Sequence, residues 1–311
     1  MFTRVASGRP RVVREIRAAA PLMSRLRAPV TARGPWLTTV LTVQDALRSR
    51  ARPVAVVVEP GRQGRPEALA LLALRSHGVA VEVTFLGDDL APVPGGRPPA
   101  RLFAADPHAA ELLAEGMLGL LASLRRPWTL RLAGLPLGCP TTAALAARME
   151  TAAFGSSRSA RLVDTLEATD EPVSRTRDPR VLDRALPGLL GRLPDESSGT
   201  FLRTASRVHA AIGQVELAWI GALETPRAAL LTLVDGTDRW PWWGFSPDGE
   251  LPTGMGAPLV SLTATGGPRP RVPMPWVPWP RWPRWSEVWP EVWQRRPGRG
   301  GPREPVHGGA G

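Results

Sequence analysis

The chain has 311 residues, of which 43% are hydrophobic, and a formal net charge of +11. It is long enough to bury a substantial core, as one large domain or as two smaller ones. Lysine, asparagine and tyrosine are absent, which excludes a Schiff-base lysine, a phosphate-loop lysine and a tyrosine general acid. These three residues have AT-rich codons, so their absence also indicates a GC-rich genome.

The positive charge is concentrated at the two ends of the chain. Residues 1–52 hold eleven arginines against two acidic residues, a net charge of +9, and residues 267–311 hold eight arginines against three, a net charge of +5. The remaining residues, 53–266, therefore carry −3. Basic ends are typical of proteins that bind nucleic acid or an anionic surface. They also follow from GC-rich coding alone, and both interpretations stay open.

The chain has a single cysteine, Cys139. It excludes an internal disulfide, and no ligand set for a structural zinc site accompanies it. No apolar run approaches the roughly 20 residues of a membrane span, and the basic N-terminus is not followed by the apolar segment of a signal peptide. We therefore expect a cytoplasmic protein with no transmembrane segment and no metal site.

The first predicted element is a short basic helix at residues 11–20. Val12, Ile16 and Ala19 recur there at helical spacing, with arginines on the opposite side, which predicts a helix packed on the core with a solvated basic face. The further elements expected up to residue 150 are a helix at 36–50, strands at 53–58, 68–74 and 79–86, a helix at 107–125, a strand at 128–132 and a helix at 141–149.

A similar alternation follows from residue 151. The expected elements are a strand at 161–166, helices at 179–193 and 200–212, strands at 214–220, 228–234 and 240–245, and an apolar segment at 259–263. This order predicts an α/β (mixed α+β) fold of two similar halves, 34–150 and 151–265, preceded by a basic helix and linker at 1–33. Residues 266–311 have the composition of a disordered Pro/Trp/Arg/Gly tail.

The tail carries a regular series of tryptophans. Trp276, Trp279, Trp282 and Trp285 recur at every third position among prolines, so a polyproline II helix would place them along one edge. Such a strip can stack on single-stranded nucleic acid, lie at a membrane interface, or cover an apolar patch of the core. We favour the last, because free tryptophans promote aggregation.

Two titratable residues are candidates for catalysis. His209 lies at the edge of an apolar helix face, where a histidine is more often a hydrogen-bonded core residue than a catalytic one. Glu216 lies on a mostly apolar strand, where desolvation would raise its pKa and let it accept a proton from an amine. The alternative for Glu216 is a carboxylate that faces water.

The next candidates are substrate-binding residues. Asp235 and Asp238 bracket a short sequence that is by default a turn. Arg239 opens a run in which Trp240, Trp242 and Trp243 lie close together. Those aromatic rings would either line a ligand cleft or fill the core, and we favour the core.

The order of several segments resembles a known family. The segments are Gly34–Leu37, Pro53–Glu59, Ala68–Leu74, Val83–Asp88, Pro127–Pro136, Gly213–Ile220, Ala228–Val234, Trp243–Asp248 and Gly256–Val260. They resemble the GNAT-like acyltransferases of the FemAB and cellulose-biosynthesis type, which have two tandem GNAT-like halves. The resemblance implies mixed sheets flanked by helices, and transfer of an acyl group from acyl-CoA or another acyl donor to a small-molecule amine. The Gly-rich pyrophosphate loop of ordinary GNAT enzymes is not evident.

Two functions remain open at this point. The chain is either an acyltransferase homologue, or a non-catalytic interaction protein on the same fold that binds a partner or a polyanion through its basic ends and Trp strip. An open cleft beside His209 or Glu216 would favour the enzyme. A cleft filled by Trp240, Trp242 and Trp243 would favour the interaction protein.

Overall fold

The structure is a computed structural model that describes residues 1–61, 64–88, 90, 100–193 and 195–268. Contacts define one compact unit, Met1–Arg269, and the tail beyond it lies outside the described residues. The helices are α1 (Arg9–Ala18), α2 (Ala20–Arg25), α3 (Gly34–Ala46), α4 (Pro107–Ser123), α5 (Pro140–Ala146), α6 (Pro179–Leu190) and α7 (Glu196–Ala211), with 3-10 turns η1 (Val30–Ala32) and η2 (Leu166–Ala168). The strands are β1 (Phe2–Ser7), β2 (Arg52–Glu59), β3 (Ala68–His77), β4 (Ala80–Phe85), β5 (Phe103–Ala104), β6 (Trp128–Pro136), β7 (Ala153–Leu162), β8 (Ser174–Thr176), β9 (Val215–Gly221), β10 (Pro226–Asp235), β11 (Asp238–Ser246), β12 (Gly249–Glu250) and β13 (Thr253–Gly266).

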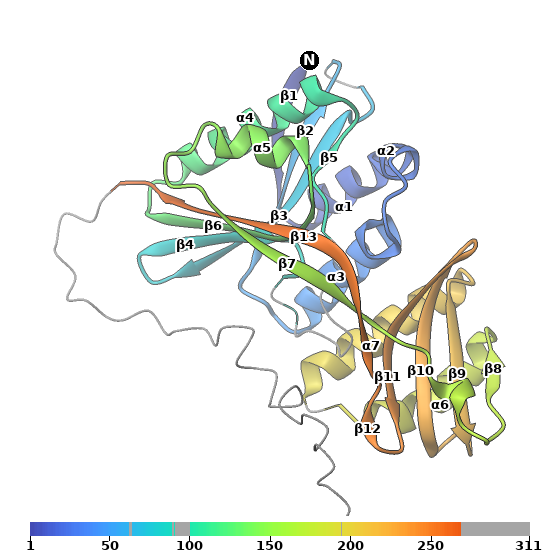
Figure 1. The fold of residues 1–311 in the computed structure, drawn as a ribbon. Helices are drawn as coiled ribbons and strands as arrows, with labels where there is room; N and C mark the ends of the chain where they lie inside the picture. The colour runs from blue at the N-terminus through green and yellow to red at the C-terminus, as the bar shows by residue number, and fades with distance from the viewer. Residues whose placement is uncertain (62–63, 89, 91–99, 194, 269–311) are drawn as a thin grey trace, which may run out of the picture. The chain divides into compact units, whose positions relative to one another are not determined.

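The strands form two sheets (Figure 1). The first sheet has eight strands in the order β1-β2-β3-β4-β6-β13-β7, with β5 beside β3. Its neighbouring strands are antiparallel except for β4 and β6, which are parallel and are joined by the crossover helix α4. The second sheet has five strands in the order β12-β11-β10-β9-β8, all antiparallel. The predicted class, a mixed α/β fold with two sheets flanked by helices, is confirmed.

Both faces of the first sheet are covered by helices. Side chains of β2 alternate between the faces: Ala55 and Val57 join the core cluster that contains α1, α2 and α3, whereas Val54 and Val56 join the cluster that contains α4 and α5. A strand buried on both faces reads as a continuous apolar run, which is why 53–58 was predictable as a strand. Asp106 caps α4 by accepting a hydrogen bond from the backbone N–H of Ala109 at 2.8 Å.

Helices α6 and α7 cover one face of the second sheet. Phe201 and Leu202 of α7 share a core cluster with Val215 and Leu217 of β9. The same cluster contains Trp36 of α3, and α3 contacts α7 directly. The two sheets are therefore joined by a helix pair inside one continuous apolar core.

The boundaries of the sheets differ from the predicted division at residue 150. Strand β13 lies between β6 and β7 in the first sheet, with Leu262 opposite both Leu132 and Phe154. The segment 163–252, which forms the second sheet, is thus inserted between two neighbouring strands of the first. Sequence order alone cannot show this, because β13 returns across more than a hundred residues to pair with β6.

Several strands were missed or misplaced by the sequence analysis: β1, β5, β8 and β12 were not predicted, and β7 was misplaced. The prediction of a strand at 161–166 was wrong, since β7 spans Ala153–Leu162 and its first residues have no apolar alternation. Strand β1 carries Arg4 in place of an apolar residue, and the guanidinium of Arg4 pairs with the buried carboxylates of Glu15 and Glu59. The basic helix at the N-terminus is confirmed as α1, with Val12 and Ile16 fully buried.

Candidate functional site

His209 lies in α7, at the junction of α7 with α3. Its side chain has 0% exposure, and its Nδ1 lies 3.2 Å from Oε1 of Gln214. Its ring centroid lies 6.0 Å from that of Trp36, and Nε2 has no hydrogen-bond partner among the described residues. Burial lowers the pKa of His209, so the imidazole is neutral at neutral pH. The interpretation of His209 as a hydrogen-bonded core residue is confirmed.

Glu216 lies in β9 and is held by three arginines. Its carboxylate accepts hydrogen bonds from Arg239 and, at 3.3 Å in each case, from Arg175 and Arg177. Hydrogen bonding to Arg239 is the main cause that lowers the pKa of Glu216, and Arg177 and Arg175 add to it. The predicted rise of this pKa is therefore wrong, because the neighbouring arginines outweigh the effect of burial. An ionised carboxylate so held is a weak proton acceptor.

His209 and Glu216 are not brought together. Along β9, Val215 and Leu217 face the core that contains α7, whereas Ala218 and Ile220 belong to the cluster on the opposite face. Glu216 alternates with Val215 and Leu217, so it lies on the face away from α7. The sheet itself therefore separates the two candidate catalytic residues.

Each candidate substrate-binding residue has a structural role: an ion pair, a place in a hairpin turn, or a place in the core. Asp235 ends β10 and forms an ion pair with Arg33 at 2.7 Å. Asp238 begins β11 opposite Asp235, as expected for a hairpin turn, and Arg239 bonds to Glu216. Trp243 is 2% exposed.

The aromatic run in β11 fills the core instead of lining a cleft. Trp242 is buried, and its ring meets Trp36 at 5.4 Å and Phe201 at 6.3 Å between centroids. Trp240 also lies against Trp36, at 6.4 Å. The preference for a core role of these tryptophans is confirmed for the buried Trp242 and Trp243. Trp36 was not singled out from the sequence, because its partners are distant in the chain.

A different place in the fold is suited to a ligand by its topology. The parallel strands β4 and β6 pair from Val81 with Trp128 to Thr84 with Arg131, and β6 then continues to Pro136 without β4 beside it. Ligands of open α/β sheets bind beyond the carboxyl ends of such strands. The crossover helix α4 follows β5, and two of its first three residues offer no free N–H group: Pro107 has none, and the N–H of Ala109 bonds to Asp106. An acidic cap disfavours an anion at this helix end.

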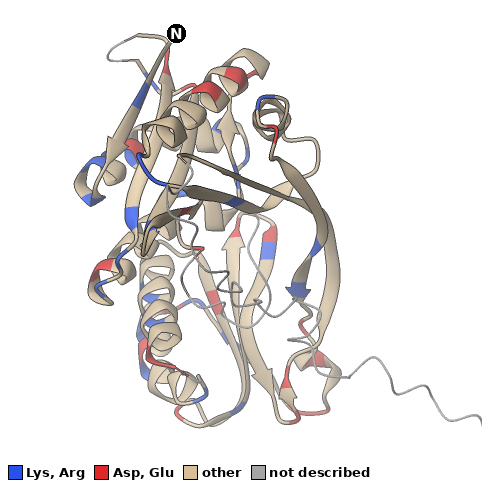
Figure 2. Cartoon of the chain, turned by 90° about the vertical axis from the view of Figure 1, so that its left-hand side faces the viewer, with Lys and Arg blue, Asp and Glu red and all other residues tan. Residues whose placement is uncertain are grey.

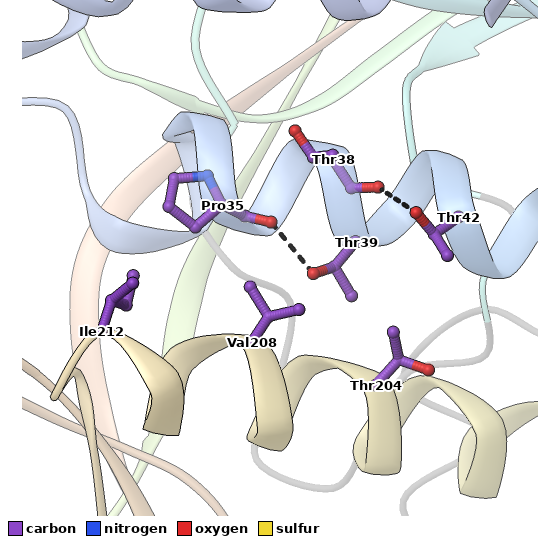
Figure 3. A pocket seen from close by; sticks show the side chains of 7 residues that line it. All are labelled: Pro35, Thr38, Thr39, Thr42, Thr204, Val208 and Ile212. Atoms are coloured by element: carbon purple, nitrogen blue, oxygen red, sulfur yellow. Dashed lines mark hydrogen bonds between the residues drawn. The ribbon is translucent and has the colours of Figure 1, made fainter.

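A shallow apolar pocket of about 290 Å³ lies between α3 and α7 (Figure 3). Pro35, Thr38, Thr39 and Thr42 line it from α3, and Thr204, Val208 and Ile212 line it from the α7 side. The hydroxyls of Thr39, Thr42 and Thr204 donate to backbone carbonyls of their own helices. The pocket therefore presents methyl groups and no polar group for recognition.

Acidic and basic positions are interspersed over helices and strands (Figure 2). Among these residues, no three His, Cys, Asp or Glu side chains gather in a way that could hold a metal ion, and no helix is long and apolar enough to cross a membrane.

No family model and no curated protein matches the chain. Several solved structures resemble it, among them the following three. The first is a tandem GNAT protein from the clavulanic acid biosynthesis pathway, at 13% identity over 86% of this chain and 100% of that one, with a TM-score of 0.35. The second, from Enterococcus faecalis V583, is described as a probable N-acyltransferase, at 11% identity over 84% and 72% of the two chains, with a TM-score of 0.30. The third is a GCN5-related N-acetyltransferase from Sphaerobacter thermophilus, at 11% identity over 85% and 96%, with a TM-score of 0.30.

Proposed function

We propose that the chain is a non-catalytic interaction protein built on an acyltransferase-like fold. The observation that carries this proposal is the packing around His209. Trp36, Phe201 and Trp242 fill the space at the junction of α3, α7 and β11, where an open cleft was the requirement for an enzyme. His209 is sealed inside this packing with 0% exposure.

The requirements of acyl transfer also support this proposal, because the candidate residues do not meet them. A general base must reach the amine, and the acceptor and donor must be held in contact. His209 has no exposed surface. Glu216 is ionised, and its negative charge is balanced by ion pairs with Arg175, Arg177 and Arg239. Neither residue meets the first requirement. The acidic cap of α4 works against binding the phosphates of an acyl-CoA at that helix.

Acyl transfer remains the second candidate because of one observation: β6 continues beyond the point where its pairing with β4 ends. Among the described residues, no strand lies beside β6 beyond Arg131 on the β4 side, although the backbone carbonyl of Gly134 accepts from the N–H of Ala100 at 3.0 Å. A parallel pair that parts in this way leaves backbone groups free to bind an acyl donor.

Acetyl-CoA binding and turnover distinguish the two candidates. We expect no heat of binding for acetyl-CoA in titration calorimetry, and no transfer of a labelled acetyl group to primary amines above the rate without protein. Transfer above that rate contradicts the proposal. In that case Ala133→Trp, in the stretch of β6 beyond Arg131, should abolish transfer, while Ala222→Trp, on an exposed loop of the second sheet, should not.

A further inference from the structure

Strand β7 is the last strand of the first sheet. It pairs with β13 on one side, and no described strand pairs with it on the other. Residues 153–158 are all exposed. Because successive side chains of a strand point to opposite faces, this half of β7 is open to solvent on both faces as well as along its edge.

The opposite edge of the same sheet is protected. Helices α1 and α4 both contact β1, and Arg4 of β1 is tied to Glu15 and Glu59. Unpaired edges are normally blocked by charges, prolines, bulges or a covering element. In β7, Gly155, Ser156 and Ser157 have small side chains that leave the row of backbone N–H and C=O groups accessible.

An apolar contact and a charge pattern accompany the open edge. Phe154 is 58% exposed, and it lies opposite Leu262, which is fully buried in the core cluster of α4 and α5. The apolar face of the sheet thus continues outward through Phe154. Arg158 and Arg161 are the charged residues of β7, and β13 has none. No described acidic side chain forms an ion pair with either arginine.

We propose that residues 153–158 form a docking edge for an extended acidic segment of a partner protein, which adds to the first sheet as a further strand. Backbone hydrogen bonds would join the segment to β7, and Phe154 would supply an apolar contact. Arg158 and Arg161 lie on opposite faces of the strand, and each would select an acidic side chain on its own face. A second copy of β7 fits less well, because two copies bring four arginines to one seam, and like charges across a strand pair are destabilising. The proposal names a partner class for the interaction function and rests on it.

Binding of a synthetic strand peptide tests the docking edge on the full chain. The probe is a fluorescent ten-residue peptide with valine and threonine in one half and glutamate in the other half, so that acidic side chains lie on both faces of the strand. Its binding is measured by fluorescence anisotropy. Its control has the same sequence with N-methyl groups on two consecutive central residues, which blocks both of its edges. We expect the unmodified peptide to bind at least about tenfold more tightly than the methylated one, since main-chain hydrogen bonds supply much of the affinity in strand addition.

Variants locate the binding. Arg158→Glu with Arg161→Glu should weaken it by about tenfold or more, and Phe154→Ser by several-fold. The matched pair Arg180→Glu with Arg203→Glu has the same charge change on exposed positions of α6 and α7 and should leave binding within about threefold of the original. In hydrogen exchange, the amides of residues 153–158 that do not bond to β13 should gain protection when the peptide is added.

Several outcomes overturn the proposal. They are equal binding of the methylated peptide, equal losses in the two double variants, no detectable binding of the acidic peptide, or protection, before any peptide is added, of those amides of 153–158 that do not bond to β13. The last result would mean that a second copy of the chain occupies the edge, which sedimentation would show as a dimer. Acetyl transfer is measured separately, so these outcomes do not bear on whether the chain is an enzyme.

Discussion

The carboxylate of Glu216 illustrates how neighbouring side chains decide the chemistry of a single residue. It is buried, which by itself would favour its neutral form, but three guanidinium groups reach it from β8, β11 and the segment after β8. Asp164 and Glu167 in turn hold Arg175 at 2.9 and 2.7 Å. Three positive and three negative groups therefore balance across this face of the second sheet.

Removing the charge of Glu216 should destabilise the protein. Glu216→Gln leaves three arginines close together with two carboxylates to share, and we expect a loss of about 1–3 kcal/mol in the free energy of unfolding, because hydrogen bonds to a charged group are replaced by weaker ones. Chemical denaturation at pH 7 measures it. Glu224→Gln, on an exposed loop, is the control and should be nearly neutral. Equal stability of both variants would mean that the cluster is only a surface contact.

The stability difference between the wild type and Glu216→Gln should depend on pH. The pKa of Glu216 is lower in the folded state than in the unfolded chain, so its contribution is complete above the unfolded value of about 4.3. It is lost as the pH falls from there through the folded value. The difference in stability between the wild type and Glu216→Gln should therefore shrink between pH 5 and pH 3. A difference that stays constant over this range would contradict the assignment.

His209 should show its burial in a different pH range. Its pKa is lowered in the folded state, so folding favours the neutral ring, and stability is complete above the unfolded value of about 6.5 and declines as the pH falls below it. Asp235 and Arg33, the charged groups near the start of α3, are paired with each other. The melting temperature of the wild type should thus fall more between pH 7.5 and 5.5 than that of His209→Gln.

Replacing His209 by alanine should cost about 1–3 kcal/mol at pH 7.5, because the side-chain oxygen of Gln214 loses its partner and a cavity opens beside Trp36. An unchanged melting temperature would contradict the core role of the ring.

Elements whose burial follows a regular period were predictable from the sequence. The apolar run of β2 and the leucine-rich face of α4 both matched their expected ranges closely, because each packs on the core along its whole length. Strand β1 and the first half of β7 lie at sheet edges and lack such a pattern. The partners of Glu216 were equally out of reach, since Arg175 and Arg239 meet it only through strand pairing over 41 and 23 residues.

Helix α4 offers a direct test of how closely it packs on the first sheet. A Cβ atom added at Gly116 would lie 2.8 Å from Cγ1 of Val56 and closer still to Thr3, whereas one added at Gly119 would meet nothing within 4 Å. Gly116→Ala should therefore cost about 1–3 kcal/mol by overpacking. Gly119→Ala should gain about 0.5–1 kcal/mol from helix propensity. Denaturant unfolding of the two variants measures both, and a stabilising Gly116→Ala would show that α4 lies farther from β1.

At the scale of the whole molecule, residues 1–268 contain both sheets and all three buried core clusters. A shortened chain that ends at Pro268 should therefore unfold in one cooperative transition, with the same midpoint as the full chain. The predicted role of the Trp strip as a cover lies outside the described residues, and it adds the expectation that the shortened chain is less soluble. Concentration limits before aggregation, measured for both chains, check this. Equal solubility would leave the tail as a free arm.

The final prediction concerns polyanions and compares the same two chains. The N-terminal residues have a net charge of +9 in the sequence, but the fold ties Arg25 and Arg33 to Glu67 and Asp235, acids from outside that region. Less free positive charge remains there than the composition indicates, and residues 53–266 are net negative. Residues 267–311 contribute a net charge of +5 and the Trp strip, so the shortened chain should bind single-stranded DNA more weakly than the full chain. Affinity of the full chain should fall with salt, by a log–log slope of about −0.7 per phosphate contact for single strands.

If bases stack on the Trp strip, Trp279→Ala with Trp282→Ala should weaken single-strand binding by about 1–3 kcal/mol for each stacked base that is lost, without weakening heparin binding. If heparin, duplex and single strands bind equally and the two substitutions change nothing, the basic ends act only as diffuse charge.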